Sequence, residues 1–248
     1  MTKFKLGVAL GGGAARGYAH LGVLQALKEQ GIEADIYSGT SAGAIVGAFM
    51  AAGNSPEEVF KLMKRNSLFD FAKMMLPSMG LMSLDKLGVH LQKTIPYTNL
   101  EDLPKPLIVT ASNLHTGKVR YISRGSLVKA VQASSTIPLL FRPIEIDGEL
   151  YVDGGVLDNL PFRPLTNICD QVIAIHICPV RPVKVLKSLH QVVARSFELC
   201  INGHIPEGRR ANRTVIAPAG IETFDLFDTK NADKLFEIAY KHAGKLTF

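Results

Sequence analysis

Apolar runs and helical periods alternate along the first fifty residues. Residues 4–10 (FKLGVAL) form a short apolar run without a helical period, bounded by three glycines, and predict a buried strand. Residues 34–39 predict a second strand, and helices are expected over residues 14–31 and 41–53. The first helix is expected to turn one apolar face inward, made of Ala19, Val23, Ala26 and Leu27, and to end at Gly31. Strand and helix alternation with glycine-rich joints is typical of parallel strands connected by crossover helices.

The rest of the chain adds further strands and helices to this pattern. A Thr-Gly turn within residues 106–125 and an Asp-Gly turn within residues 142–155 each predict a pair of strands, and residues 171–180 predict a buried strand. Four more helices are expected, over residues 55–66, 126–135, 185–201 and 231–246. The sequence therefore predicts an α/β fold with three layers, in which helices cover both faces of a largely parallel central sheet.

Composition supports a single soluble globular domain that spans residues 1–248. The chain has 248 residues, of which 47% are hydrophobic and 20% charged, and no stretch resembles a linker. Its three cysteines, Cys169, Cys178 and Cys200, fit no metal-ligand or CxxC pattern and are expected to be reduced thiols. We therefore expect neither a metal nor a cofactor.

Charge and hydropathy bear on location and partners. The N-terminus lacks the apolar core of a secretory signal, and the apolar stretch 42–53 is too short to span a bilayer, so a cytoplasmic location is expected. The net charge is +6, with basic residues gathered at 181–187 and 208–213. Nucleic acid is not expected, because no aromatic interleaving or known motif accompanies them. The basic residues indicate peripheral contact with an anionic membrane or a merely solvated face. Nothing in the sequence indicates the oligomeric state.

The second strand-to-helix joint reads G-T-S-A-G, with Ser41 at its centre. Glycines around a serine allow a tight turn, so the hydroxyl would stand at the end of the strand above a helix N-terminus. That position suits a nucleophile, although small residues are common at such joints. A nucleophilic serine also needs a base and donors for an oxyanion.

The first joint, GGGAARG (residues 11–17), can direct backbone N–H groups at an anion. Its spacing does not fit the dinucleotide fingerprint G-x-G-x-x-G: counted from Gly11 the third glycine falls on Arg16, and counted from Gly12 the second falls on Ala14. A phosphate-binding P-loop also fails, because Tyr18 follows Gly17. The turn keeps its capacity to bind an anion, such as a phosphate or an oxyanion.

A base for the serine is harder to find among the histidines. None of the seven lies in a convincing context, and His176, for example, is expected inside an apolar strand. The conspicuous carboxylate is Asp153 in YVDGG, which could also be a turn aspartate bonded to its own backbone, and Asp158 is a rival. A Ser–Asp dyad is chemically sufficient if the carboxylate is partly desolvated.

The ordered set GGGAARG, GTSAG and DGG, together with residues 132–144 (QASSTIPLLFRPI), resembles the patatin-like phospholipase family over about residues 5–165. The resemblance implies a Ser–Asp dyad without histidine that hydrolyses acyl esters of lipids, as a phospholipase A or lysophospholipase does.

Carried onto this chain, the resemblance implies that Ser41 is the nucleophile and that Asp153 is the base and later the acid. The oxyanion donors would come from Gly12, Gly13 and Ala14, with Arg16 close by. Ala14 departs from the glycine of the family's motif. Because alanine resists a positive φ, the loop is expected to hold a conformation that alanine accepts.

Other interpretations remain open on the sequence alone. A catalytically silent lipid-binding or scaffold protein could keep the same motifs, and a nucleotide-binding oxidoreductase could use the first glycine turn. The methionine-rich segment 63–82 suits contact with acyl chains equally as well as packing in the core.

Overall fold

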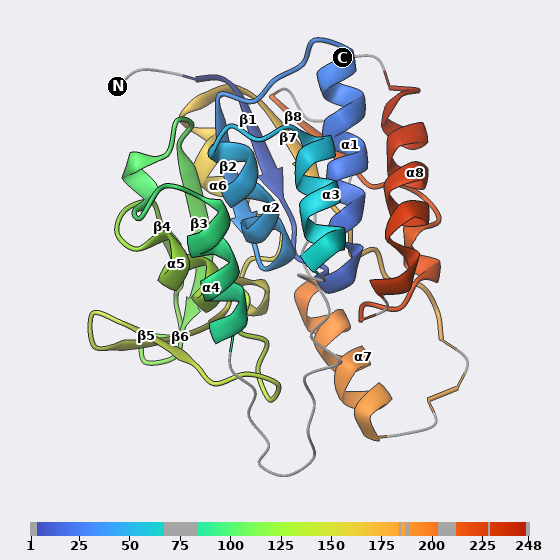
Figure 1. Cartoon of the computed structure of the whole chain (residues 1–248). Helices are drawn as coiled ribbons and strands as arrows, with labels where there is room; N and C mark the ends of the chain where they lie inside the picture. The colour runs from blue at the N-terminus through green and yellow to red at the C-terminus, as the bar shows by residue number, and fades with distance from the viewer. Residues whose placement is uncertain are drawn as a thin grey trace.

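The computed structural model describes residues 4–66, 84–183, 185–186, 189–202, 212–227 and 229–246. These residues form a sheet of eight strands between helical layers (Figure 1). The strands are β1 (Phe4–Leu10), β2 (Ile36–Thr40), β3 (Leu107–Asn113), β4 (Val119–Ile122), β5 (Ile144–Ile146), β6 (Glu149–Asp153), β7 (Cys169–Ile175) and β8 (Arg213–Ile216). The spatial order is β5-β6-β3-β2-β1-β7-β8, with β4 also paired to β3.

Five neighbouring strands of the sheet pair in parallel, and the other three join them by antiparallel pairing. Strands β3, β2, β1, β7 and β8 run in one direction, whereas β4 and β6 pair antiparallel with β3, and β5 with β6. The expected hairpins of residues 106–125 and 142–155 are thus confirmed. In the second hairpin Asp147 and Gly148 have φ of 54° and 78°, as a two-residue turn between twisted strands requires.

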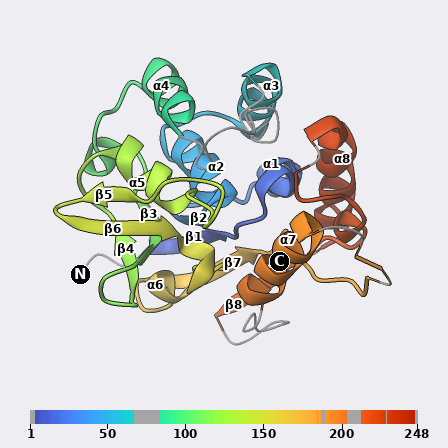
Figure 2. The same ribbon diagram turned by 90° about the horizontal axis from the view of Figure 1, so that it is seen from below.

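Helices cover one face of the sheet heavily and the other face thinly. They are α1 (Tyr18–Glu29), α2 (Ala42–Ala51), α3 (Pro56–Asn66), α4 (Asp85–Thr94), α5 (Leu127–Ser134), α6 (Arg163–Thr166), α7 (Leu189–Asn202) and α8 (Ala232–Ala243). Viewed from below, α1 to α5 and α8 lie on one side of the sheet, and the single turn of α6 on the other (Figure 2). Helix α7 lies beside the carboxyl ends of the strands, at the bottom of Figure 1. The predicted three-layer fold is therefore confirmed.

Local signals in the sequence explain several of these boundaries. Ser55 caps α3 through a reciprocal pair of contacts with Glu58, and Ser126 caps α5 by accepting from the Lys129 N–H. Helix α1 ends before Gly31, which has a φ of 75°. This helix is buried on more than the expected face, because α8 packs along it on the side away from α2.

Three expectations about segments need correction or fall outside the described residues. Strand β7 ends at Ile175, so the buried His176 lies just beyond the strand and not inside it. Strand β8 was not predicted. Residues 67–82 of the methionine-rich segment and residues 208–211 of the second basic cluster are not among the described residues, whereas Met63 is buried in the core.

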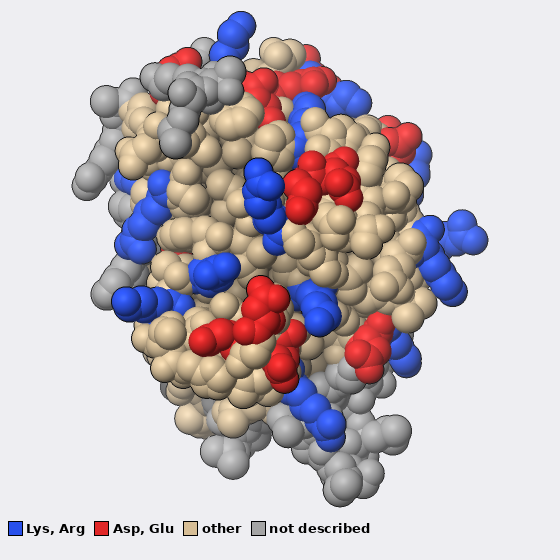
Figure 3. Space-filling model, turned by 90° about the vertical axis from the view of Figure 1, so that its left-hand side faces the viewer, with Lys and Arg blue, Asp and Glu red and all other residues tan. Residues whose placement is uncertain are grey.

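Membrane and charge expectations are tested only in part. Within the described ranges, no helix is both long and apolar enough to cross a membrane. Basic and acidic side chains are interspersed on the face shown in Figure 3, so the net positive charge is not concentrated there. The cytoplasmic location stays a prediction.

Candidate active site

Strand register brings the predicted site residues to one edge of the sheet. Thr40, the last residue of β2, pairs with Thr110 of β3, and the next residue of β3, Ala111, pairs with Asp153. On the other side of β2, Gly39 pairs with Leu10 of β1. The turn after β1, the turn after β2 and the end of β6 therefore meet at the carboxyl ends of the parallel strands.

Ser41 occupies a strained turn between β2 and α2. Its φ is 53° and its ψ is −121°, a conformation that non-glycine residues rarely adopt. The glycines on either side permit close packing: a Cβ on Gly39 would lie 2.5 Å from the Gly43 carbonyl oxygen, and one on Gly43 would lie 2.1 Å from the Leu10 carbonyl oxygen. The Ser41 N–H donates to Ser134 Oγ at 2.9 Å. These contacts fix the serine above the N-terminus of α2.

Asp153 ends β6 with its carboxyl group buried. The Asp153 N–H donates to the Thr136 carbonyl at 2.8 Å, and Asp153 Oδ1 accepts from the Gly155 N–H at 2.7 Å. Burial raises the pKa of Asp153 to about 7, although hydrogen bonds from the Ser41 side chain and the Gly155 N–H oppose the rise. A carboxyl group with this pKa can accept and return a proton near neutral pH.

The contact between Ser41 and Asp153 is close enough to lower the pKa of the carboxyl group, but it is long or poorly aligned as a hydrogen bond. Asp153 Oδ2 is buried and has no well-formed hydrogen bond within the described part of the chain. Catalytic hydrogen bonds often tighten only when a substrate binds. Oδ2 therefore keeps lone pairs that are free to accept a proton.

The first glycine turn supplies two free N–H groups beside the serine. Gly12 is pressed against Ser41, since a Cβ on Gly12 would lie 3.2 Å from Ser41 Cβ, but the Gly12 N–H donates to the Asn159 carbonyl at 3.0 Å. The N–H groups of Gly13 and Ala14 donate to no atom of the described residues. Gly13 and Ala14, and not Gly12, are therefore the available oxyanion donors.

Ala14 adopts a left-handed conformation, with a φ of 47°. The loop was expected to take a shape that avoids a positive φ at this position, and that expectation is wrong. An alanine in this region costs about 1–2 kcal/mol relative to the right-handed conformation. The surrounding contacts therefore hold Ala14 in this unfavourable conformation.

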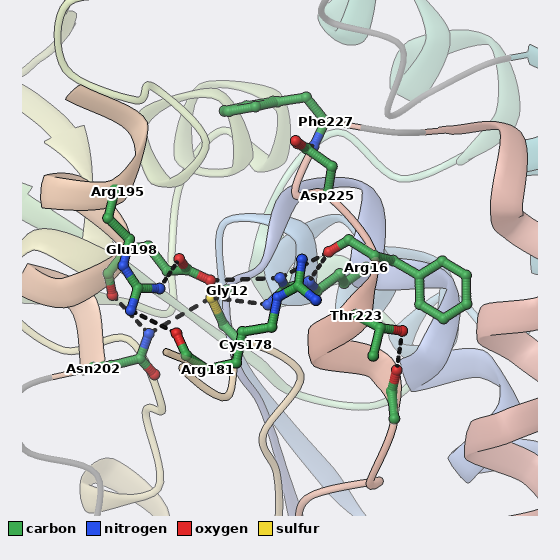
Figure 4. Close-up of polar contacts among 12 residues, drawn as sticks. Gly12, Arg16, Cys178, Arg181, Arg195, Glu198, Asn202, Thr223, Asp225 and Phe227 are labelled. Carbon is green, nitrogen blue, oxygen red and sulfur yellow. Dashed lines mark hydrogen bonds and ion pairs between the residues drawn. The ribbon is translucent and has the colours of Figure 1, made fainter. Parts of the chain in front are cut away.

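Arg16 does not face the serine. Its Nε and one terminal nitrogen donate to the Phe224 carbonyl at 3.0 and 2.8 Å, and that terminal nitrogen lies 3.4 Å from Glu198 Oε1 (Figure 4). The expected place of Arg16 beside the oxyanion is thus corrected: the side chain anchors the turn to α7 and to the segment before α8. Only its backbone, whose N–H donates to the Gly13 carbonyl at 3.0 Å, takes part in the turn.

Two further residues of the site were not identified from the sequence. Ser134 holds the Ser41 backbone, and Asn159 contacts the first glycine turn through its carbonyl and, at 3.4 Å, through its side-chain amide. Ser134 lies within residues 132–144, which were noted for the family resemblance, and Asn159 directly follows Asp158.

The rival acid is engaged elsewhere, and the histidines that the structure describes lie outside the pocket. Asp158 Oδ2 accepts from the Tyr121 hydroxyl at 2.6 Å, and no histidine lines the pocket around Ser41. His20 Nε2 lies 2.7 Å from the Gly11 carbonyl, and burial lowers the pKa of His20 to about 4, so this histidine is neutral and supports the glycine turn. Among the described residues, no group of three or more potential ligands could hold a metal ion.

The pocket over the dyad is small and lined mainly by apolar side chains. Its volume is about 20 Å³, and besides the site residues it is lined by Ile137, Phe197, Ile201, Leu226 and Phe227. Phe197 and Ile201 belong to α7, which therefore covers the serine. The arrangement can perform acyl transfer on an apolar substrate once this cover moves.

The sequence is similar to those of several known proteins. A family model described as Patatin-like phospholipase matches residues 8–166. An uncharacterised NTE family protein of Mycobacterium tuberculosis is 36% identical over 174 residues, which cover 69% of this chain and 48% of the relative. A protein of Mycosarcoma maydis named lysophospholipase is 34% identical over 162 residues, covering 63% of this chain but 9% of its own length. The matched part of the chain thus spans about half of the first relative and a small fraction of the second.

Solved structures with little sequence identity share the fold. VipD from Legionella pneumophila superposes with a TM-score of 0.55 and 17% identity, covering 97% of this chain and 66% of its own.

Proposed function

The chain belongs to the patatin-like phospholipase family, and from this membership and the geometry around Ser41 we propose that it is a serine hydrolase of lipid acyl esters. Ser41 is the nucleophile and Asp153 is its base. The observation that carries the proposal is a buried carboxyl group, with a pKa raised to about 7, beside a serine on a strained turn.

The acylation step follows from the placement of these groups. Ser41 Oγ attacks the ester carbonyl carbon while Asp153 Oδ2 takes the hydroxyl proton. The N–H groups of Gly13 and Ala14 stabilise the negative charge that develops on the carbonyl oxygen. Loss of one such donor commonly costs about 2.7–4 kcal/mol of transition-state stabilisation. The protonated Asp153 then donates its proton to the leaving alkoxide, and an acyl ester of Ser41 remains.

Deacylation uses the same groups in reverse order. Asp153, again a carboxylate, takes a proton from water as the water oxygen attacks the acyl-enzyme. The tetrahedral intermediate collapses, the fatty acid leaves, and the proton returns to Ser41. No histidine is needed, because a carboxylate whose pKa lies near neutral pH is basic enough for both steps.

The substrate we propose is a lysophospholipid or another phospholipid with an accessible acyl ester. Apolar side chains around the dyad suit an acyl chain. A relative named lysophospholipase also supports this class of substrate.

Paired variants test the dyad. Ser41→Ala and Asp153→Asn should each lower kcat for a short-chain ester and for a lysophospholipid by about 10³-fold or more. Asp158→Asn is the matched control, because asparagine can still accept from Tyr121, and it should stay active. A fluorophosphonate probe should label the peptide that contains Ser41 in the wild type and in Asp158→Asn, and should not label Ser41→Ala. Full turnover by Ser41→Ala, or inactivity of Asp158→Asn beside an active Asp153→Asn, would overturn the assignment.

The same experiment separates the other interpretations. Vesicle binding without acyl release by the wild type would favour a silent lipid-binding protein. Saturable binding of NAD(P) would favour a nucleotide-binding oxidoreductase.

A further inference from the structure

Helix α7 closes the catalytic pocket. Phe197 and Ile201, four residues apart on one side of the helix, line the space above Ser41 and Asp153. The remaining volume of about 20 Å³ is close to what a single water molecule requires. An acyl ester can therefore reach Ser41 only after α7 or the neighbouring side chains move.

The same helix carries a second apolar face that points to solvent. Val192 and Leu199, seven residues apart, are both exposed, Leu199 by 49%. At about 100° per residue, this pair lies on nearly the opposite side of the helix from Phe197 and Ile201. Helix α7 therefore shows apolar side chains both to the dyad and to the outside.

The segment before α7 adds exposed apolar side chains along the neighbouring flank of the helix, where it lines a groove with Gln191 and Arg195. Val183, Val185 and Leu186 are exposed, Val185 by 64%. Among the described residues, eleven large apolar side chains are exposed, and six of them lie between Val180 and Leu199. Such a concentration on one segment is unusual for a surface that faces only water. We call residues 180–186, 192 and 199, without residue 184, the outer face.

The charge of this region complements an anionic lipid surface. Arg181 is exposed, and its guanidinium makes no ion pair within the described part of the chain. In the sequence, residues 181–187 contain three basic residues and no acidic one, and the whole chain has a net charge of +6. Each basic residue near an anionic bilayer contributes about 1 kcal/mol to binding.

A polar cluster holds α7 in its closed position. The Glu198 carboxylate lies between Arg16, from the glycine turn, and Arg195, which it contacts at 2.6 Å (Figure 4). Asn202 Nδ2 lies 3.6 Å from Cys178 Sγ. These groups lie on the flank of α7, between its two apolar faces. In water the helix is thus held over the dyad while the apolar side chains of its outer face stay exposed to solvent.

We propose that the outer face docks on an anionic phospholipid bilayer and that docking draws α7 away from Ser41. The proposal rests on the proposed function, since it assigns the substrate to a lipid aggregate. Val192, Leu199 and the residues before them enter the interface, Arg181 meets the lipid phosphates, and Phe197 and Ile201 leave the pocket. Burial of the outer face in lipid offsets the loss of the contacts made by Glu198.

The absence of tryptophan from the sequence allows a single-site probe of docking. Leu199→Trp is combined with Ser41→Ala, so that hydrolysis cannot alter the vesicles. Its emission should shift to shorter wavelength when vesicles of phosphatidylcholine with phosphatidylglycerol are added, and should be quenched by lipids brominated along the acyl chain. Val89→Trp, at an exposed position on α4, is the matched control and should not respond. Equal responses at both sites, or none at Leu199→Trp, would overturn the proposal.

Charge insertion tests the surface without a probe. Val192→Glu with Leu199→Glu should weaken co-sedimentation with the anionic vesicles by about tenfold or more, whereas Val89→Glu should not. Hydrolysis of a water-soluble ester in the double variant should stay at the low level that the wild type shows without vesicles, while hydrolysis of vesicle lipid should fall.

The outcomes distinguish docking from catalysis. If the double variant binds vesicles as well as the wild type and Ser41 still reacts with the fluorophosphonate, the docking proposal is wrong and the proposed function is not contradicted. Conversely, docking without any ester cleavage contradicts the proposed function alone. If sedimentation shows a dimer that the double variant dissociates, and the wild type ignores vesicles, the outer face binds a second copy and the proposal is wrong.

Discussion

Asp153 is a carboxyl group that the fold keeps out of water, and its titration should control the reaction. Because burial raises the pKa of Asp153 to about 7, the base is protonated and inactive in acid. We expect kcat/KM for an uncharged ester to rise with pH, with a midpoint near 7, and then to level off. Measurement from about pH 5 to 9 tests this directly. A profile with its midpoint near 4, or a flat one, would show that another group is the base.

The same residue should lower the stability of the protein at alkaline pH. Between the ordinary value of 3.8 and the folded value of about 7, the native state holds a proton that the unfolded chain has lost. The free energy of unfolding therefore falls as the pH rises through this window. Asp153→Asn does not titrate and can still accept from Gly155, so at pH above about 8 it should be more stable than the wild type by a few kcal/mol.

Urea unfolding at several pH values measures this difference. The advantage of Asp153→Asn should shrink as the pH falls and disappear below about pH 3, where Asp153 is neutral in both the folded and the unfolded state. An advantage that is independent of pH would mean that the asparagine acts through packing and not through charge.

At the residue scale, short motifs located the proposed dyad but could not orient every side chain. Ser41 and Asp153 each sit at a strand end flanked by glycine, and that local signal sufficed to place them. The direction of Arg16 depends on Phe224 and Glu198, which lie about two hundred positions away along the chain. No pattern around GGGAARG carries that information, and the positive φ of Ala14 is hidden for the same reason.

Among the elements, the packing of α2 against β1 is the most demanding contact. A Cβ on Gly43 would lie 2.1 Å from the Leu10 carbonyl oxygen, which belongs to the sheet and cannot move aside. Gly43→Ala should therefore destabilise the protein by about 3 kcal/mol and abolish activity, because the turn that carries Ser41 would shift. Thermal unfolding and ester turnover measure both effects.

Gly47→Ala, one turn further along the same helix, is the matched control. There the new Cβ would meet the end of the Leu107 side chain at 3.0 Å, and a side-chain end can adjust. Alanine also favours the helix by about 1 kcal/mol relative to glycine. If both variants lost equal stability, the close approach of α2 to β1 would not be the cause.

The elements of the first fifty residues were predictable because glycine turns separate short apolar runs. The hairpins were predictable for a similar reason, through their Thr-Gly and Asp-Gly turns. Strand β8, by contrast, has only four residues, and its edge position gives it a mixed pattern of burial. The end of β7 was placed too late because Ile177 and Cys178, beyond the end of the strand, are also apolar and buried.

At the scale of the whole molecule, the sheet extends beyond the part that defines the family. The family match ends at residue 166, whereas β7, which pairs with β1 along six positions, and α8, which packs along α1, come later. We therefore propose that residues 1–248 form one domain. The chain should unfold in a single cooperative transition, and residues 4–166 alone should not fold cooperatively.

Calorimetry of both chains tests this prediction. Agreement of the calorimetric and van't Hoff enthalpies is expected for the full chain only. Two separate transitions in the full chain, or a cooperative transition of residues 4–166, would contradict it.

The layered architecture could be predicted from the sequence, but the closure of the site could not. Alternation of strands and helices fixes which elements form the sheet and which cover it. Whether α7 rests over Ser41 depends instead on Glu198 meeting Arg16, a contact between distant segments that leaves no periodic trace.

The Asn159 side chain lies between two turns of the site, one that contains Gly12 and one that contains Gly155, and couples them. A Cβ on Gly12 would lie 2.4 Å from Asn159 Oδ1, and a Cβ on Gly155 would lie 2.9 Å from the same atom. A substitution in either turn must displace the Asn159 side chain. Once it is displaced, a second substitution in the other turn meets a smaller steric clash. The two turns should therefore show epistasis, with a double substitution costing less than the sum of its parts. A substitution in one turn should therefore be tolerated better when the other turn already carries one.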